Sequence, residues 1–307
     1  MMNYNMSLLW FLRSIIVGFY LYRLKKYFFH LNVSIYILFH FKKPINTIIK
    51  IRNKKYPFIL EKKNGKTIEI KSKIQLSFIL KKMENMFSIE NNLLTIKFNS
   101  KLLKFTNYES MELDIFSQKL YSNLSVKNKT VIDVGGGVGD SALLYRTLGA
   151  KKVIMIEPQL VFFESAKQNI ELNKELQNIE IHNLVLSSTI GIYMIDHKQS
   201  GDLGEINESK ENGVPIPKIT IDKFLSNYHE QNFVLKMDCE SCEYDVLLSI
   251  PEDTLRKFEY IFIEFHNGCL NISQRLEKSG FKIKILNSKL TPNKRCRGHL
   301  LATRNKL

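Results

Sequence analysis

The chain has 307 residues and a formal net charge of +15, from 45 Lys and Arg against 30 Asp and Glu. Hydrophobic residues at 44% and charged residues at 24% exclude a disordered chain, and 14 Gly with 7 Pro exclude a collagen-like one. At about 100–200 residues per domain, the length predicts two domains or one large one. Four Cys are too few for a disulfide framework, so we expect a reducing compartment, the cytoplasm.

The net charge is concentrated at the amino-terminal end. Up to Lys82 there are 17 Lys and Arg but only Glu61 and Glu69, whereas the rest of the chain has 28 basic and 28 acidic residues. A basic block of this kind favours a polyanionic partner, either an anionic membrane surface or a nucleic acid.

Residues 1–43 form a basic aromatic segment that we expect to be helical. Arg13 interrupts its first apolar run, and the uncharged run 27–41 has 15 residues, fewer than the roughly 18 that a membrane-spanning helix needs. A signal peptide is not expected either. Three interpretations remain: peripheral contact with the inner face of a membrane, packing on the body of the protein, and nucleic-acid binding.

Residues 44–110 are predicted to form a small α+β lead-in. Short β-prone runs cover 47–52, 56–60, 67–70 and 93–98, and residues 75–83 have helical spacing. Alternating apolar residues around Asn99-Ser100 predict a hairpin that turns there. Nothing in this lead-in indicates catalysis.

A glycine loop follows the β-prone run that starts at Thr130. After Gly135, Gly136, Gly137 and Gly139 come a short helix ending at Gly149 and a second β-prone run, an order that predicts a βαβ unit with a parallel sheet. Glu157 ends the second run, 22 positions after Gly135. An acid at this position accepts hydrogen bonds from the hydroxyls of an adenosine ribose.

The spacing of the loop decides between nucleotide ligands. A dinucleotide fingerprint would need glycine where Asp140 stands, and no Gly-Lys-Ser/Thr follows, which excludes a P-loop. The spacing Asp133-x-Gly135-x-Gly137-x-Gly139 is instead similar to the first motif of class I S-adenosylmethionine-dependent methyltransferases. The Asp133 carboxylate suits a ligand with a cationic amino group and a sulfonium. We therefore expect S-adenosyl-L-methionine to be held by Asp133, Gly135, Gly137, Gly139 and Glu157.

Acidic residues and a histidine follow two later strands. Residues 232–248 lead from a buried strand into a helix through Asp238, Glu240 and Glu243, and the strand 258–266 ends in Glu264 and His266. The carboxyl ends of parallel strands face one crevice, so we expect all five on the acceptor side of the site.

Methylation of a hydroxyl needs a base. His266 is the first candidate, because an unperturbed pKa of about 6.5 leaves it mostly neutral near pH 7, and Asp238 is the second. The alternatives are a helix-start role for Glu243, a core role for His266, and for Asp238 acceptor orientation or metal binding with Glu240 and Glu264. No dedicated metal ligand is predicted.

Four segments in this order resemble FkbM-type methyltransferases: VIDVGGGVGDS (131–141), IEP (156–158), KMDCESCEYDVLL (236–248) and IEFH (263–266). The resemblance implies a doubly wound, Rossmann-like α/β class I methyltransferase sheet over 111–307. It also implies O-methylation of a hydroxyl-bearing acceptor such as a glycan, a glycolipid or a related metabolite. The chain departs from the family pattern at Gly136-Gly137, usually Ala-Asn, and at Ser241, usually Gly.

The sequence leaves two alternative functions. An RNA methyltransferase would use the basic charge for phosphate, but the chain has no Asn/Asp-Pro-Pro-Tyr/Phe run and the methyltransferase part is nearly neutral. A membrane-associated module that binds the cofactor without catalysis is the second. It would require the acidic cluster at the two strand ends (Asp238, Glu240, Glu243 and Glu264) to be structural.

The remaining features complete the prediction. Cys239 and Cys242 form a CxxC pair, for which zinc and a disulfide are alternatives, but ordinary buried thiols are expected for all four Cys. Strands are expected at 178–188 and 190–195, a polar lid at 201–217, and two last strands at 281–286 and 298–304, the final one antiparallel.

Overall fold

The computed structural model divides between Asn85 and Met86 into two compact units. It describes residues 37–53, 55–65, 67–71, 76, 87–90, 93–108, 111, 114–117, 121, 124–196, 213–291, 293 and 295–305. Most of the basic aromatic segment and the helix expected at 75–83 lie outside this part of the chain, so the three-part division predicted from the sequence stays a prediction. No helix in the described ranges is long and apolar enough to cross a membrane.

The first unit contains a helix and a hairpin. Helix α3 (Pro44–Asn53) is followed by the antiparallel strands β1 (Phe58–Glu61) and β2 (Thr67–Ile70). The strand predicted at 47–52 is wrong, because these residues are helical. Ile48 and Ile51 are buried while Ile49 is exposed, a one-sided burial that suits a helix despite the β-branched side chains.

The second unit is built on a seven-stranded sheet with the order β14-β15-β13-β12-β6-β7-β8. Its strands, in chain order, are β6 (Thr130–Val134), β7 (Lys152–Ile156), β8 (Ile179–His182), β12 (Phe233–Met237), β13 (Phe258–Phe265), β14 (Phe281–Leu290) and β15 (Cys296–Arg304). β15 is antiparallel to both of its neighbours, β13 and β14. The prediction of a doubly wound α/β sheet with an antiparallel last strand is confirmed.

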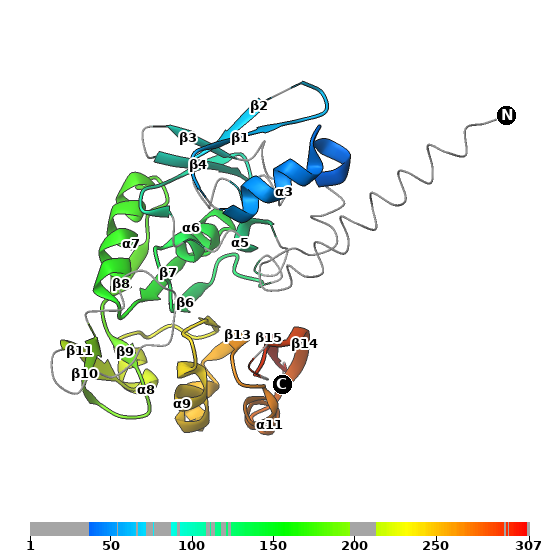
Figure 1. Cartoon of the computed structure of the whole chain (residues 1–307). Helices are drawn as coiled ribbons and strands as arrows, with labels where there is room; N and C mark the ends of the chain where they lie inside the picture. The colour runs from blue at the N-terminus through cyan, green and yellow to red at the C-terminus, as the bar shows by residue number, and fades with distance from the viewer. Residues whose placement is uncertain are drawn as a thin grey trace. The chain divides into compact units, whose positions relative to one another are not determined.

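The central strands carry the core and determine where a ligand can bind. Every residue of β6 and of β12 is buried, which is typical of parallel strands covered on both faces. From β6 the chain proceeds outward to β7 and β8, and it then returns to the other side of β6 as β12 and β13 (Figure 1). Such a reversal leaves a crevice beyond the carboxyl ends of β6 and β12.

Helices connect the strands. Helix α6 packs against β6 and β7, α7 against β8, and α11 against both α9 and β14. The helices of the second unit are α5 (Asp114–Ser117), α6 (Asp140–Thr147), α7 (Leu160–Leu172), α8 (Ile221–Leu225), α9 (Cys242–Ser249), α10 (Glu252–Leu255) and α11 (Leu270–Lys278).

Two smaller sheets complete the unit. β3 (Phe87–Glu90), β4 (Leu93–Phe98) and β5 (Lys101–Phe105) form one of them. The predicted hairpin between β4 and β5 is confirmed, and Asn99 and Ser100 take the positive φ angles, 45° and 64°, of a tight turn.

The other small sheet has the order β10 (Gly191–Asp196), β11 (Gly213–Ile219), β9 (Val185–Leu186). The strand predicted at 190–195 is confirmed by β10, whereas residues 178–188, predicted as one strand, form two: β8 in the seven-stranded sheet and β9 in this one. The polar lid expected at 201–217 is partly wrong, because Gly213–Ile219 pairs with β10 as a strand that buries Ile216. The rest of the expected lid lies outside the described residues.

Candidate functional site

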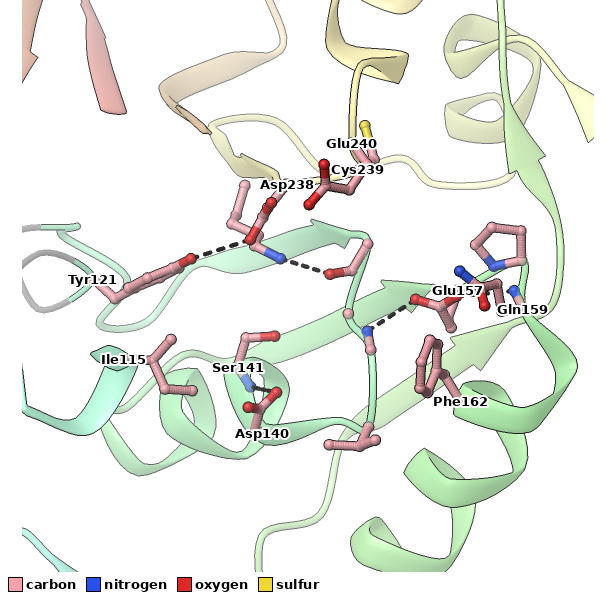
Figure 2. A pocket seen from close by; sticks show the side chains of 16 residues that line it. Ile115, Tyr121, Asp140, Ser141, Glu157, Gln159, Phe162, Asp238, Cys239 and Glu240 are labelled. Atoms are coloured by element: carbon pink, nitrogen blue, oxygen red, sulfur yellow. Dashed lines mark hydrogen bonds between the residues drawn. The ribbon is translucent and has the colours of Figure 1, made fainter. Parts of the chain in front are cut away.

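A pocket opens at the carboxyl ends of β6, β7 and β12, where the sheet order reverses (Figure 2). The glycine loop forms one part of its wall and the turn after β12 forms another. Its lining consists of residues 135–138, 140–141, 157–159, 236 and 238–240, together with Ile115, Tyr121 and Phe162.

Glycine is required at the base of the loop. A Cβ on Gly135, whose φ is +74°, would lie 1.9 Å from the carbonyl oxygen of Asp238, so only glycine lets the turns after β6 and β12 approach this closely. Gly137 also has a positive φ, +53°, but a Cβ there would meet nothing within 4 Å. The loop therefore presents bare backbone to the pocket.

Glu157 is fixed beside the glycine loop by backbone donors. The N–H of Gly137 donates to its Oε2 and the N–H of Gln159 to its Oε1, both at 2.9 Å. Burial raises the pKa of Glu157 to about 7, against the opposing effect of these two donors. Each carboxylate oxygen keeps a second lone pair that can accept a hydrogen bond from a ligand hydroxyl.

Two of the predicted cofactor residues do not line the pocket. Asp133 is fully buried, accepts a 2.6 Å hydrogen bond from Ser141 Oγ, and has Oδ1 3.2 Å from Lys236 Nζ. A Cβ on Gly139 would lie 3.3 Å from the Ala166 side chain of α7. Asp133 is thus paired inside the protein and Gly139 allows close packing of α7 against the loop, while their direct contact with a cofactor stays a prediction.

Lys236 is a functional residue that the sequence reasoning missed. Its ammonium group is buried and donates a 2.8 Å hydrogen bond to the carbonyl oxygen of Gly135, which ties β12 to the glycine loop. A lysine inside an otherwise apolar strand must find buried partners, and this rule would have identified it. Ile115 and Tyr121, which line the pocket from the segment before β6, carry no comparable sequence signal.

The predicted acidic cluster is assembled from two adjacent strand ends. One donor atom from each of Asp238, Glu264 and His266 lies within 4.8 Å of the other two. Asp238 and Glu240 line the pocket, whereas Glu243, Glu264 and His266 lie behind them. Burial raises the pKa of Asp238 to about 7, with Lys236 opposing the shift and Glu264 adding to it.

His266 is held between two carboxylates. Its side chain is 1% exposed, with Nδ1 3.0 Å from Glu243 Oε1 and Nε2 3.3 Å from Glu240 Oε2. Burial lowers the pKa of His266, but the contacts and charges of Glu240 and Glu243 outweigh this and raise the pKa to about 10. This environment differs from the one expected for a neutral base, because both acids come within reach of the ring.

The remaining members of the cluster have partners on β15. Glu264 Oε2 lies 3.1 Å from His299 Nε2, and burial, which raises the pKa of Glu264, is outweighed by His299, so that this pKa is lowered. Glu240 Oε2 lies 3.4 Å from a guanidinium nitrogen of Arg297. The sequence could not identify these partners, since they depend on the antiparallel register that sets His299 opposite Glu264.

The cysteines differ from the expectation of buried thiols. Cys239 and Cys242 are joined by a disulfide, whereas Cys269 and Cys296 are free and half-buried. Between the bonded pair, Ser241 has a φ of 97°, a backbone conformation that favours glycine, the residue that the FkbM resemblance leads us to expect there.

Comparison with known proteins finds a family match within the second unit. Residues 133–283 match the family model described as the methyltransferase FkbM domain. A search of curated proteins finds no match.

Among solved structures, the ribosomal protein L11 methylase of Lactobacillus delbrueckii subsp. bulgaricus is 15% identical over 67% of this chain and 88% of its own, with a TM-score of 0.41. The precorrin-6y C5,15-methyltransferase of Geobacter metallireducens GS-15 is 9% identical over 64% and 93%, with a TM-score of 0.40. Magnesium protoporphyrin IX methyltransferase of Synechocystis PCC 6803, solved with bound SAM, is 16% identical over 61% and 74%, with a TM-score of 0.33.

Proposed function

Because residues 133–283 form a methyltransferase FkbM domain, we propose that the protein transfers a methyl group from S-adenosylmethionine to a hydroxyl group of a glycan, a glycolipid or a related metabolite. The observation that supports this most is that one pocket contains both the glycine loop with Glu157 and the acidic turn at Asp238. A cofactor and an acceptor bound there would lie next to each other.

The cofactor end of the pocket suits an adenosine with a charged amino-acid chain. Glu157 would accept the ribose hydroxyls, and the bare backbone of Gly135 and Gly137 leaves room for close approach. Lys236 and Asp133 would keep the loop in shape. When bound, S-adenosylmethionine supplies an activated methyl group.

At the acceptor end, the proton of the acceptor hydroxyl must be removed, because a hydroxyl is a poor nucleophile until its proton is lost. Asp238 is the residue best placed to meet that hydroxyl, since its carboxylate is at the pocket surface. His266, the other predicted base, lies behind the pocket with both ring nitrogens next to carboxylates. We assign His266 and Glu243 to positioning.

The charge of the acceptor end favours a neutral acceptor over RNA. Asp238 and Glu240 line the pocket and Glu264 lies close behind, so the phosphates of an RNA backbone would be repelled there. The cations that would suit RNA phosphates are concentrated before residue 83. For this part of the chain the alternatives are contact with a membrane, with the protein itself or with a nucleic acid.

Isothermal calorimetry tests the cofactor. We expect binding of S-adenosylmethionine and S-adenosylhomocysteine but not of NAD. Glu157→Ala should weaken binding by about 1.5–3 kcal/mol, the range for hydrogen bonds to a charged group. Glu164→Ala, which removes an exposed acid of α7, is the matched control and should change nothing. Unchanged affinity in Glu157→Ala would remove Glu157 from the cofactor site.

Methyl transfer from labelled cofactor into fractionated glycan, lipid, metabolite and RNA pools tests the acceptor. We expect label in one of the first three pools, as a methyl ether. Label confined to RNA would overturn the choice of acceptor. Cofactor binding with no transfer to any pool would favour a binding module.

A further inference from the structure

Three side chains, one lining the pocket and two behind it, have the composition of a metal site. A donor atom from each of Asp238, Glu264 and His266 lies within 4.8 Å of the other two. Three donors evenly placed around one ion at about 2.2 Å lie at most about 3.8 Å from one another, so side-chain movements of up to about 1 Å would bring the three around one ion. Two carboxylates with one imidazole suit a divalent transition metal better than Ca²⁺ or Mg²⁺.

The imidazole of His266 is oriented as in many metal sites. Glu243 Oε1 lies 3.0 Å from Nδ1 and accepts the proton that this nitrogen carries. Nε2 is then the nitrogen that could bind an ion; it is buried and lies 3.3 Å from Glu240 Oε2, a contact whose place the ion would take. A carboxylate behind the distal nitrogen of a ligating histidine is a common arrangement, because it fixes the ring and its tautomer.

The other two donors are oriented as well. His299 Nε2 contacts one oxygen of Glu264 at 3.1 Å, which leaves the second oxygen for a ligand. Tyr121 Oη lies 3.5 Å from Asp238 Oδ2 (Figure 2). Each side chain of this trio (Asp238, Glu264 and His266) is therefore held by a neighbour outside it.

The surroundings of the trio carry more negative than positive charge. Among the described residues the group contains five carboxylates and two permanent cations: Asp133, Asp238, Glu240, Glu243 and Glu264, with Lys236 and Arg297. Even with a protonated His266 the carboxylates outnumber the cations, and buried carboxylates without counter-charge are costly.

We propose that Asp238, Glu264 and His266 bind one divalent transition-metal ion, and that this ion holds the acceptor hydroxyl. The role of the ion in holding the acceptor hydroxyl rests on the proposed function. A bound cation lowers the pKa of a hydroxyl that it coordinates. The O–H bond then breaks with its electron pair staying on oxygen beside the cation, and the proton leaves to solvent water.

The test uses the full chain after chelator treatment, titrated with Mn²⁺ and followed by electron paramagnetic resonance. We expect one saturable site per chain, with affinity lowered at least tenfold in His266→Ala and in Asp238→Asn. His182→Ala is the matched control: this histidine also contacts a glutamate, with Nε2 2.6 Å from Glu180 Oε1, but lies outside the trio, and Mn²⁺ affinity should be unchanged. Circular dichroism and cofactor affinity check that each variant is folded.

The outcomes separate this proposal from the proposed function. No saturable Mn²⁺ binding, or equal affinity in the wild type and His266→Ala, overturns the metal site. Full methyl transfer by chelator-treated protein also overturns it but leaves the methyltransferase intact, with Asp238 as the direct proton acceptor. Site-specific Mn²⁺ binding without transfer to any acceptor pool supports the metal site while contradicting the proposed function.

Discussion

At the residue scale, the environment of Glu157 makes cofactor binding depend on pH. Burial raises its pKa to about 7, so the carboxylate becomes protonated as the pH falls below this value and loses acceptor capacity for the ribose hydroxyls. If only the ionised form binds tightly, affinity for S-adenosylhomocysteine should fall about tenfold from pH 8 to pH 6.

Calorimetry at both pH values, on the wild type and on Glu157→Gln, measures this effect. The amide cannot titrate, so the variant should bind more weakly but with little pH dependence. An equal loss of affinity between pH 8 and pH 6 in both proteins would assign the titration to another group.

At the residue scale, some contacts of the site could be predicted from the sequence and others could not. Strand-end positions predicted that Asp238, Glu264 and His266 would meet, and they do. The protonation of His266 could not be predicted, because it depends on how closely Glu240 and Glu243 approach the ring. The ion pair of Asp133 with Lys236 was not predicted, because it depends on the pairing of β6 with β12.

At the scale of elements, the glycine loop predicts a contrast between two substitutions. Gly137→Ala places a Cβ in open space and should cost about 1–2 kcal/mol for its left-handed backbone alone. Gly135→Ala adds a clash with the carbonyl of Asp238 and should cost about 2–4 kcal/mol of unfolding free energy in total.

Urea unfolding of both variants provides the comparison. Gly135→Ala should also weaken cofactor binding more strongly, since the turns after β6 and β12 must separate. Equal unfolding free energies would contradict the close approach of these two turns.

Elements were predictable where the local pattern and the burial agree. Strands β6 and β12 are mostly apolar runs, followed by a glycine loop and by an acidic turn respectively, and both were predicted. Helix α3 was missed, because its isoleucines have high strand propensity while the pattern of burial, which favours a helix, is a tertiary property. The end of the expected lid was missed for a similar reason: Gly213–Ile219 has a strand partner in β10 that the sequence did not reveal.

At the scale of the whole molecule, the charge is divided unequally along the chain. Seventeen Lys and Arg precede residue 83, and the rest of the chain is neutral. The methyltransferase sheet is thus accompanied by a basic amino-terminal part, for which an anionic membrane surface is one proposed partner.

Sedimentation with lipid vesicles tests this partner. Each Lys or Arg near an anionic surface contributes about 1 kcal/mol, so replacing Arg13, Arg23, Lys25 and Lys26 by Gln should lower vesicle affinity at least about tenfold. Binding should also weaken with salt and disappear on neutral vesicles. If the wild type stays in the supernatant with anionic vesicles, the segment has another role.

The proposed methyl transfer depends most on Asp238, which lies where the cofactor and acceptor ends of the pocket meet. Single-turnover methyl transfer to the identified acceptor, with cofactor saturating, compares the wild type with Asp238→Asn directly. The amide keeps the shape of the side chain but can neither take a proton nor bind a cation as well as a carboxylate. We predict a rate at least about tenfold lower in the variant, with cofactor affinity within twofold of the wild type. Equal rates in the two proteins would contradict the assignment of this acidic cluster to methyl transfer.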